Sequence, residues 1–131
     1  MRQQKRSNPS VPPERFKASV IVSGLFDLAP IAATYINNYI CLDDDGVRTL
    51  SPLHHIPAAN RPIGPLVLGT GEHELAEYFL HQSRYAEAWA NAGHELQIYV
   101  AAGYHHFDVP YDLADENGQL HRAFRSKIDF G

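Results

Sequence analysis

Three short apolar runs restrict the fold of this chain of 131 residues more than any other feature. They lie at residues 18–23, 65–69 and 96–101, and a glycine follows each of them within two residues. Continuous β-branched and aliphatic runs of this length are typical of strands that are buried on both faces. Because helical patterns alternate with them, the sequence predicts an α/β fold with three parallel strands and flanking helices.

The predicted helices follow from spacing and from local capping residues. Between the second and third runs, a three-to-four spacing predicts an amphipathic helix that stops at Gly93. Residues 31–42 predict a helix or an irregular segment, and residues 43–46 a turn that can cap a short helix. Two further helices, split by residues 115–118, complete the pattern. The expected core face of the long helix consists of Leu75, Phe79, Gln82, Ala86 and Trp89.

Composition excludes several classes of function. The chain is 44% hydrophobic and 20% charged with a net charge of −4, which is ordinary for a globular protein. Residues 1–17 carry five basic side chains and one acidic one, and we expect them to form a basic flexible leader rather than a nucleic-acid-binding arm, because no nucleic-acid motif follows. No apolar run is long enough to span a membrane, and the start does not resemble a secretory signal. The single cysteine, Cys41, fits a reducing compartment, so we expect a cytoplasmic protein.

Acidic and imidazole groups follow two of the predicted strands. Glu72 comes shortly after the second apolar run, and His105 and His106 follow the third. In an open parallel sheet, chemistry is concentrated at the carboxyl ends of the strands. An acid that orients an imidazole leaves the second ring nitrogen free to take a proton. The sequence therefore predicts an acid–base pair at this edge of the sheet.

Five segments along the chain form a recognisable series of motifs: residues 23–31 (SGLFDLAPI), 50–55 (LSPLHH), 69–89 (from GTGE to AEAW), 103–109 (GYHHFDV) and 120–123 (LHRA). In this order they resemble bacterial kynurenine formamidases and related esterases of the α/β-hydrolase type. The resemblance covers about residues 18–125, and it implies that residues 18–131 form the C-terminal portion of an α/β-hydrolase domain whose sheet lacks its N-terminal half.

The same resemblance implies catalytic roles for particular residues. His106 matches the catalytic histidine of the family. Two residues are alternatives for the triad acid. Glu72 stands where the acid is expected when one counts from a strand end at Gly69, whereas Glu74 begins an acid-x-x-Glu-aromatic pattern at residues 74–78.

The nucleophile and the oxyanion loop of such an enzyme are missing from this sequence. No serine stands in a Gly-x-Ser-x-Gly elbow, nor does Cys41, and no His-Gly-Gly-type loop is present. We therefore expect part of a serine hydrolase that supplies the acid and histidine of a triad and is inactive alone, as a truncated frame, a split-enzyme half or a vestigial domain. The serines that lack the flanking glycine pair are Ser7, Ser10, Ser19, Ser23, Ser51, Ser83 and Ser126.

The expected partners follow from this interpretation. An ester or aryl formamide is the expected substrate, with a complementing N-terminal half or a second copy as the protein partner. The alternative is a non-catalytic binding or assembly module that retains the half-fold in an oligomer. We expect no cofactor and no metal, because His54, His55 and His105 do not belong to any metal-binding pattern.

Overall fold

A single parallel sheet organises the computed structural model, which describes residue 12 and residues 15–128. Its strands β1 (Ser19–Val22), β2 (Leu66–Gly71) and β3 (Leu96–Ala101) lie in the order β1-β2-β3. Both pairs are parallel, as predicted. β2 extends two residues beyond the predicted end at Gly69, because Thr70 and Gly71 continue the pairing with β3. Most of the expected leader lies outside the described residues.

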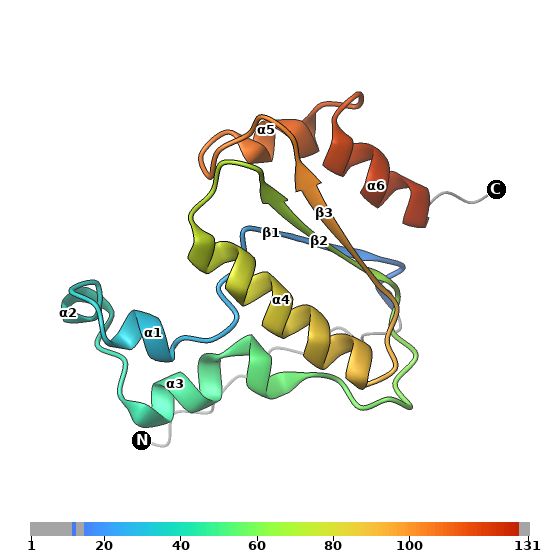
Figure 1. Cartoon of the computed structure of the whole chain (residues 1–131). Coiled ribbons are helices and arrows are strands. Elements are labelled where there is room, and N and C mark those ends of the chain that lie inside the picture. The colour runs from blue at the N-terminus through green and yellow to red at the C-terminus, as the bar shows by residue number, and fades with distance from the viewer. Residues whose placement is uncertain (1–11, 13–14, 129–131) are drawn as a thin grey trace, which may run out of the picture.

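One face of the sheet is covered by the long helix α4 (Ala76–Asn91), as Figure 1 shows. Its buried side chains include Gln82, Ala86 and Trp89, three of the five predicted core positions. The prediction that Leu75 lies on the core face of this helix is wrong, because Leu75 precedes the helix in an extended conformation and is 69% exposed. Gly93 follows the helix with φ +83°, a left-handed conformation that glycine adopts without strain. The main core cluster on this face comprises Phe26, Leu66, Leu68, Tyr85, Ala86 and Trp89.

The opposite face is covered by α5 (Val109–Ala114) and α6 (Gln119–Ile128) (Figure 1). Leu120 of α6 is fully buried and packs directly over Gly69 of β2, where a Cβ atom would lie 2.6 Å from its side chain. Asp112 of α5 is also buried, and its carboxylate accepts hydrogen bonds from the backbone N–H groups of Gln119 and Leu120 at 2.9 and 2.6 Å. It thereby satisfies two unpaired donors at the start of α6.

The segment between β1 and β2 contains short helices rather than one long one. They are α1 (Ala29–Ala32), α2 (Asn37–Ile40), α3 (Asp44–Leu50) and the 3₁₀ helix η2 (Pro52–His55). In Figure 1, α1 and α2 project to the left, away from the sheet. Asp43 caps α3 by accepting from the Gly46 N–H at 2.7 Å, as the acidic turn predicted. No helix in the described part of the chain is both long and apolar enough to cross a membrane.

Two buried side chains hold the start of this segment, one from the segment's own end and one from α4. The Ser51 hydroxyl accepts from the Leu28 N–H at 2.9 Å, and Nδ1 of His81 on α4 accepts from the Phe26 N–H at 3.1 Å. Both side chains are buried, so these bonds are shielded from water. They fix the path of the chain as it leaves β1. The end of β1 borders the site described next.

Candidate active site

The carboxyl ends of the three strands meet at one edge of the sheet. Two backbone bonds bring the loops after β2 and β3 together: the Glu72 N–H donates to the Ala101 carbonyl, and the His73 N–H to the Tyr104 carbonyl, both at 3.0 Å. Gly71 permits this approach, because a Cβ atom there would lie 2.9 Å from the Tyr104 carbonyl carbon and closer still to its oxygen. The absence of a side chain at Gly71 therefore determines how closely the two loops pack.

His106 and Glu74 form a hydrogen-bonded pair at this edge. His106 Nδ1 lies 2.9 Å from Glu74 Oε1. The Glu74 side chain is fully buried, whereas that of His106 is 38% exposed. The second carboxylate oxygen, Oε2, accepts from the Gly71 N–H at 3.2 Å. A carboxylate accepting from Nδ1–H keeps the imidazole in the tautomer whose Nε2 is an acceptor.

Glu72, the alternative acid, lies apart from His106. Its carboxylate accepts from the Gly103 N–H at 2.8 Å, and its side chain is 53% exposed. The longer β2 explains the difference: three residues beyond a strand end at Gly69 stands Glu72, but three beyond the observed end at Gly71 stands Glu74. Of the two candidate acids, the structure brings only Glu74 to His106.

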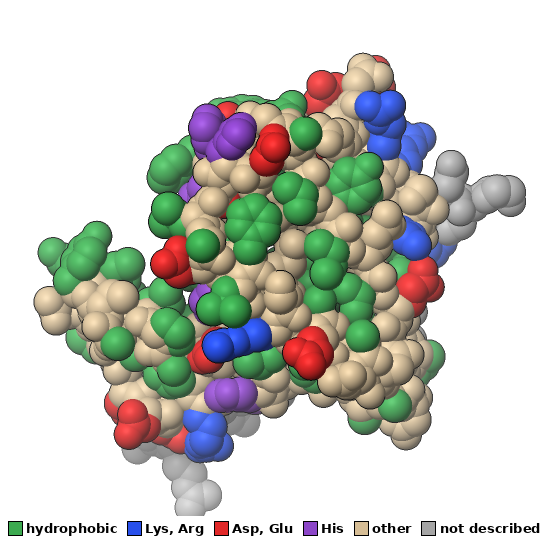
Figure 2. All heavy atoms as spheres, viewed as in Figure 1, with side chains coloured by type: hydrophobic (Ala, Val, Ile, Leu, Met, Phe, Trp, Pro, Cys, Tyr) green, Lys and Arg blue, Asp and Glu red, His purple; other side chains and the backbone are tan. Residues whose placement is uncertain are grey.

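Aromatic side chains surround the exposed part of His106. Tyr78, in the first turn of α4, stacks on the imidazole at a centroid distance of 4.6 Å, with its hydroxyl 3.5 Å from Nε2. Phe107 contacts the imidazole edge-on and is itself 88% exposed. A hollow of about 300 Å³ opens here, lined by His73, Glu74, Leu75, Tyr78, His105, His106 and Phe107. Figure 2 shows histidine side chains gathered at this end of the molecule.

Two histidines flank the hollow without joining the acid–base pair. His105 is adjacent to His106 in sequence, yet its ring lies 5.3 Å from that of His73 and not against Glu74. His73 Nε2 is 3.9 Å from the Glu72 carboxylate. These side chains border the site and are available to contact a ligand.

Ser23 is the residue of this site that sequence reasoning missed. Its hydroxyl donates a hydrogen bond to Glu74 Oε1, the same oxygen that His106 contacts. The sequence excludes Ser23 as a nucleophile, because it lacks the flanking glycine pair. Its position agrees with that exclusion, because its hydroxyl lies on the Nδ1 side of the pair and not at Nε2. The signal that could have found it is a serine at the end of a predicted strand.

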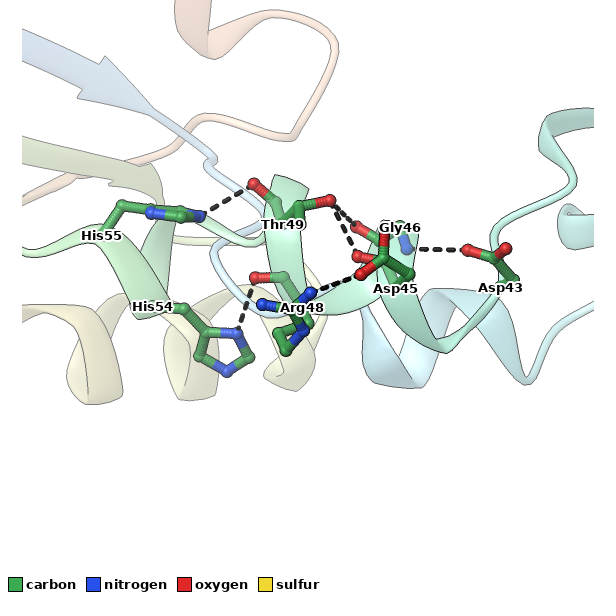
Figure 3. A network of polar contacts seen from close by, with 7 residues as sticks. All are labelled: Asp43, Asp45, Gly46, Arg48, Thr49, His54 and His55. Atoms are coloured by element: carbon green, nitrogen blue, oxygen red, sulfur yellow. Dashed lines mark hydrogen bonds and ion pairs between the residues drawn. The ribbon is translucent and has the colours of Figure 1, made fainter.

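The remaining histidine pair, His54 and His55, has a different environment. His54 Nδ1 lies 3.2 Å from the Arg48 carbonyl and His55 Nε2 lies 2.8 Å from the Thr49 carbonyl, as Figure 3 shows. Both rings therefore contact carbonyl groups in the last turn of α3, which lack partners within the helix. Within the described residues, no group of three or more His, Cys, Asp or Glu side chains is arranged to hold a metal ion.

Comparisons with known proteins found relatives that share part of this fold. No family model matches the chain. Kynurenine formamidase of Danio rerio is 23% identical over 116 residues, which are 87% of this chain and 40% of that protein. Esterase 2 of Thermogutta terrifontis, in a structure phosphoramylated by tabun, superimposes with a TM-score of 0.56 at 20% identity, over 87% of this chain and 42% of the esterase. The native esterase gives the same TM-score at 18% identity.

This chain has part of an α/β-hydrolase fold. The resemblance to kynurenine formamidases and esterases is confirmed, and the chain spans about two fifths of the length of these relatives. In α/β-hydrolases the triad residues follow one another along the chain in the order nucleophile, acid, histidine. Glu74, in the loop after β2, precedes His106, in the loop after the neighbouring strand β3, so the two residues follow the acid-then-histidine order of this fold.

Proposed function

We propose that this chain supplies the general base and the orienting acid of a serine hydrolase. The observation that carries the proposal is the His106–Glu74 pair at 2.9 Å, with the acid buried and the imidazole open to a hollow. In this role Glu74 accepts the hydrogen bond from His106 Nδ1–H. Nε2 of His106 takes the proton of an attacking serine and later donates it to the leaving group. The acid also stabilises the imidazolium that forms between these steps.

The nucleophile and the oxyanion donors have to come from residues outside this sequence. No Gly-x-Ser-x-Gly elbow is present, and Ser23 contacts the acid rather than Nε2. We therefore propose that the chain alone has no hydrolase activity and works with a complementing segment that carries the elbow. Similarity to kynurenine formamidase and to an esterase favours aryl formamides and esters as substrates.

A chimera tests this proposal directly. The matched 116-residue segment of the Danio rerio kynurenine formamidase is replaced by the corresponding part of this chain, and N-formylkynurenine and an aryl ester are assayed. We expect turnover by the chimera and none by the chain alone. Glu74→Gln should lower kcat by about 1,000- to 10,000-fold, as when a triad acid loses its charge, and His106→Ala at least as much.

Matched variants separate the site from general damage. Glu72→Gln makes the same chemical change at the other candidate acid and should alter kcat by only a few fold. His55→Ala removes a histidine that contacts α3 and should leave kcat unchanged. A folded chimera that loses activity with Glu72→Gln and retains it with Glu74→Gln would refute the assignment of the acid.

A non-catalytic assembly module is the second candidate, and exposed apolar side chains on the sheet favour it. Among the described residues, β1 and β3 are the sheet edges, and Ile98 and Val100 of β3 are 48% and 42% exposed. Figure 2, which has the same view as Figure 1, shows apolar side chains distributed over the visible side of the molecule. Such strands tend to associate with a second copy or a complementing chain. Light scattering that gives a clean monomer, with no binding of a hydrophobic dye, would contradict this association.

A further inference from the structure

The backbone of Ser23 adopts a conformation that is unusual for its residue type. Its φ angle is +52°, and among the described residues only Cys41 is another non-glycine residue with positive φ. Steric contact of Cβ with the backbone disfavours this region for L residues, and such residues persist where the surrounding structure fixes them. The Ser23 N–H still donates to the Gly69 carbonyl at 2.8 Å, so the serine is held at the very end of the β1–β2 ladder.

This conformation directs the hydroxyl to the buried acid. Ser23 Oγ donates a hydrogen bond to Glu74 Oε1. The same oxygen lies 2.9 Å from His106 Nδ1, and the other oxygen, Oε2, accepts from the Gly71 N–H at 3.2 Å. The carboxylate thus has donors from the ends of β1 and β2 and from the loop after β3. Because the Glu74 side chain is fully buried, water does not compete for these positions.

We propose that Ser23 is a positioning residue for the His106–Glu74 pair. Its hydroxyl holds Glu74 Oε1 in line with His106 Nδ1, so that the ring proton stays on Nδ1 and Nε2 remains an acceptor. The inference deepens the proposed function and rests on it for its catalytic meaning. The hydrogen-bond geometry can be measured on this chain without any turnover.

Imidazole ¹⁵N spectroscopy of the full chain tests the proposal. In mildly alkaline buffer, where imidazoles are neutral, the two ring nitrogens report which of them carries the proton. We expect His106 to show a protonated Nδ1 with slow proton exchange, and we assign its signals by their loss in His106→Gln. In Ser23→Gly, His106 should move towards the mixture of tautomers of a mobile imidazole, and the slowly exchanging proton should disappear.

The choice of variants separates positioning from stability. Glycine suits a positive φ, so Ser23→Gly removes the hydroxyl while relieving backbone strain, and its unfolding midpoint in urea should not fall. Ser23→Asn keeps a donor in a residue that tolerates this conformation and should restore part of the wild-type His106 signals. Ser83→Ala removes an exposed hydroxyl that bonds within α4 and should change nothing. Wild-type His106 signals in a folded Ser23→Gly variant would overturn the proposal.

An activity measurement distinguishes this proposal from the proposed function. In the active chimera, Ser23→Gly should lower kcat by about 10- to 100-fold with little change in KM, because a misplaced catalytic group affects the chemical step. Altered tautomers in a chimera that never shows turnover would support the role of Ser23 in holding Glu74 and reject the hydrolase. Full turnover of Ser23→Gly, with unchanged tautomers, would reject the role of Ser23 alone.

Discussion

Replacing Gly71 by alanine should separate the two loops that hold the acid and the histidine. The new Cβ would lie 2.9 Å from the Tyr104 carbonyl carbon, whereas ordinary contacts measure 3.4–4 Å, so the backbones have to part by at least about 0.5 Å. The same shift would lengthen the 2.9 Å bond between His106 Nδ1 and Glu74 Oε1, which joins the two loops, to about 3.4 Å, beyond the usual hydrogen-bonding range. Since the crowding atoms are backbone, we expect a loss of about 1–3 kcal/mol in the free energy of unfolding.

Urea unfolding followed by circular dichroism, together with amide NMR spectra, measures both effects. Gly93→Ala is the matched control: its φ is +83° and nothing lies within 4 Å of the added Cβ, so it costs about 1–2 kcal/mol through strain alone. The control should leave the amide signals of Glu74 and His106 unchanged, and Gly71→Ala should shift both. A Gly71→Ala protein with wild-type stability and wild-type signals at these residues would refute the close-approach argument.

Two further predictions concern the core next to this site. Thr70 Oγ1 is buried without a hydrogen-bond partner in the described structure, so Thr70→Val should raise the free energy of unfolding by about 1 kcal/mol in urea titrations; a loss of stability would contradict this. Burial raises the pKa of the Tyr85 hydroxyl, so the unfolded chain releases that proton first and stability should fall as pH rises above about 10. Tyr85→Phe, which keeps the stacking on Phe26, should lessen the fall, and an identical pH profile for both proteins would contradict the desolvation argument.

The strands and the long helix were predictable because their patterns are local. Continuous apolar runs mark β1, β2 and β3, and the spacing of Gln82, Ala86 and Trp89 marks α4. Such patterns predict strands without knowledge of distant partners. The prediction that all three strands are buried on both faces is wrong, because only β2 is buried throughout: β1 and β3 are the edges of the described sheet, no residue of β1 is buried, and Ile98 and Val100 of β3 are exposed. The same reasoning placed Leu75 in the core, which is wrong, because the turn before α4 carries it outside the helix.

The choice of acid depended on a strand boundary that local pattern does not reveal. A glycine usually weakens a strand, so the sequence favoured an end at Gly69. Gly69 and Gly71 are instead tolerated within β2 because Leu120 and the Tyr104 carbonyl pack against them from other elements. The role of Ser23 was hidden for a related reason: its hydrogen-bond partner is Glu74, 51 residues away.

The acid and the histidine both belong to one β2–α4–β3 unit, and this arrangement has an evolutionary consequence. Genetic exchange upstream of residue 65 would transfer the His106–Glu74 pair intact, with its separation, burial and backbone contacts. Only the Ser23 hydroxyl would depend on the sequence acquired. Under the proposed function, recombination could therefore join this acid–base pair to a new nucleophile-bearing segment while the geometry of the pair is kept.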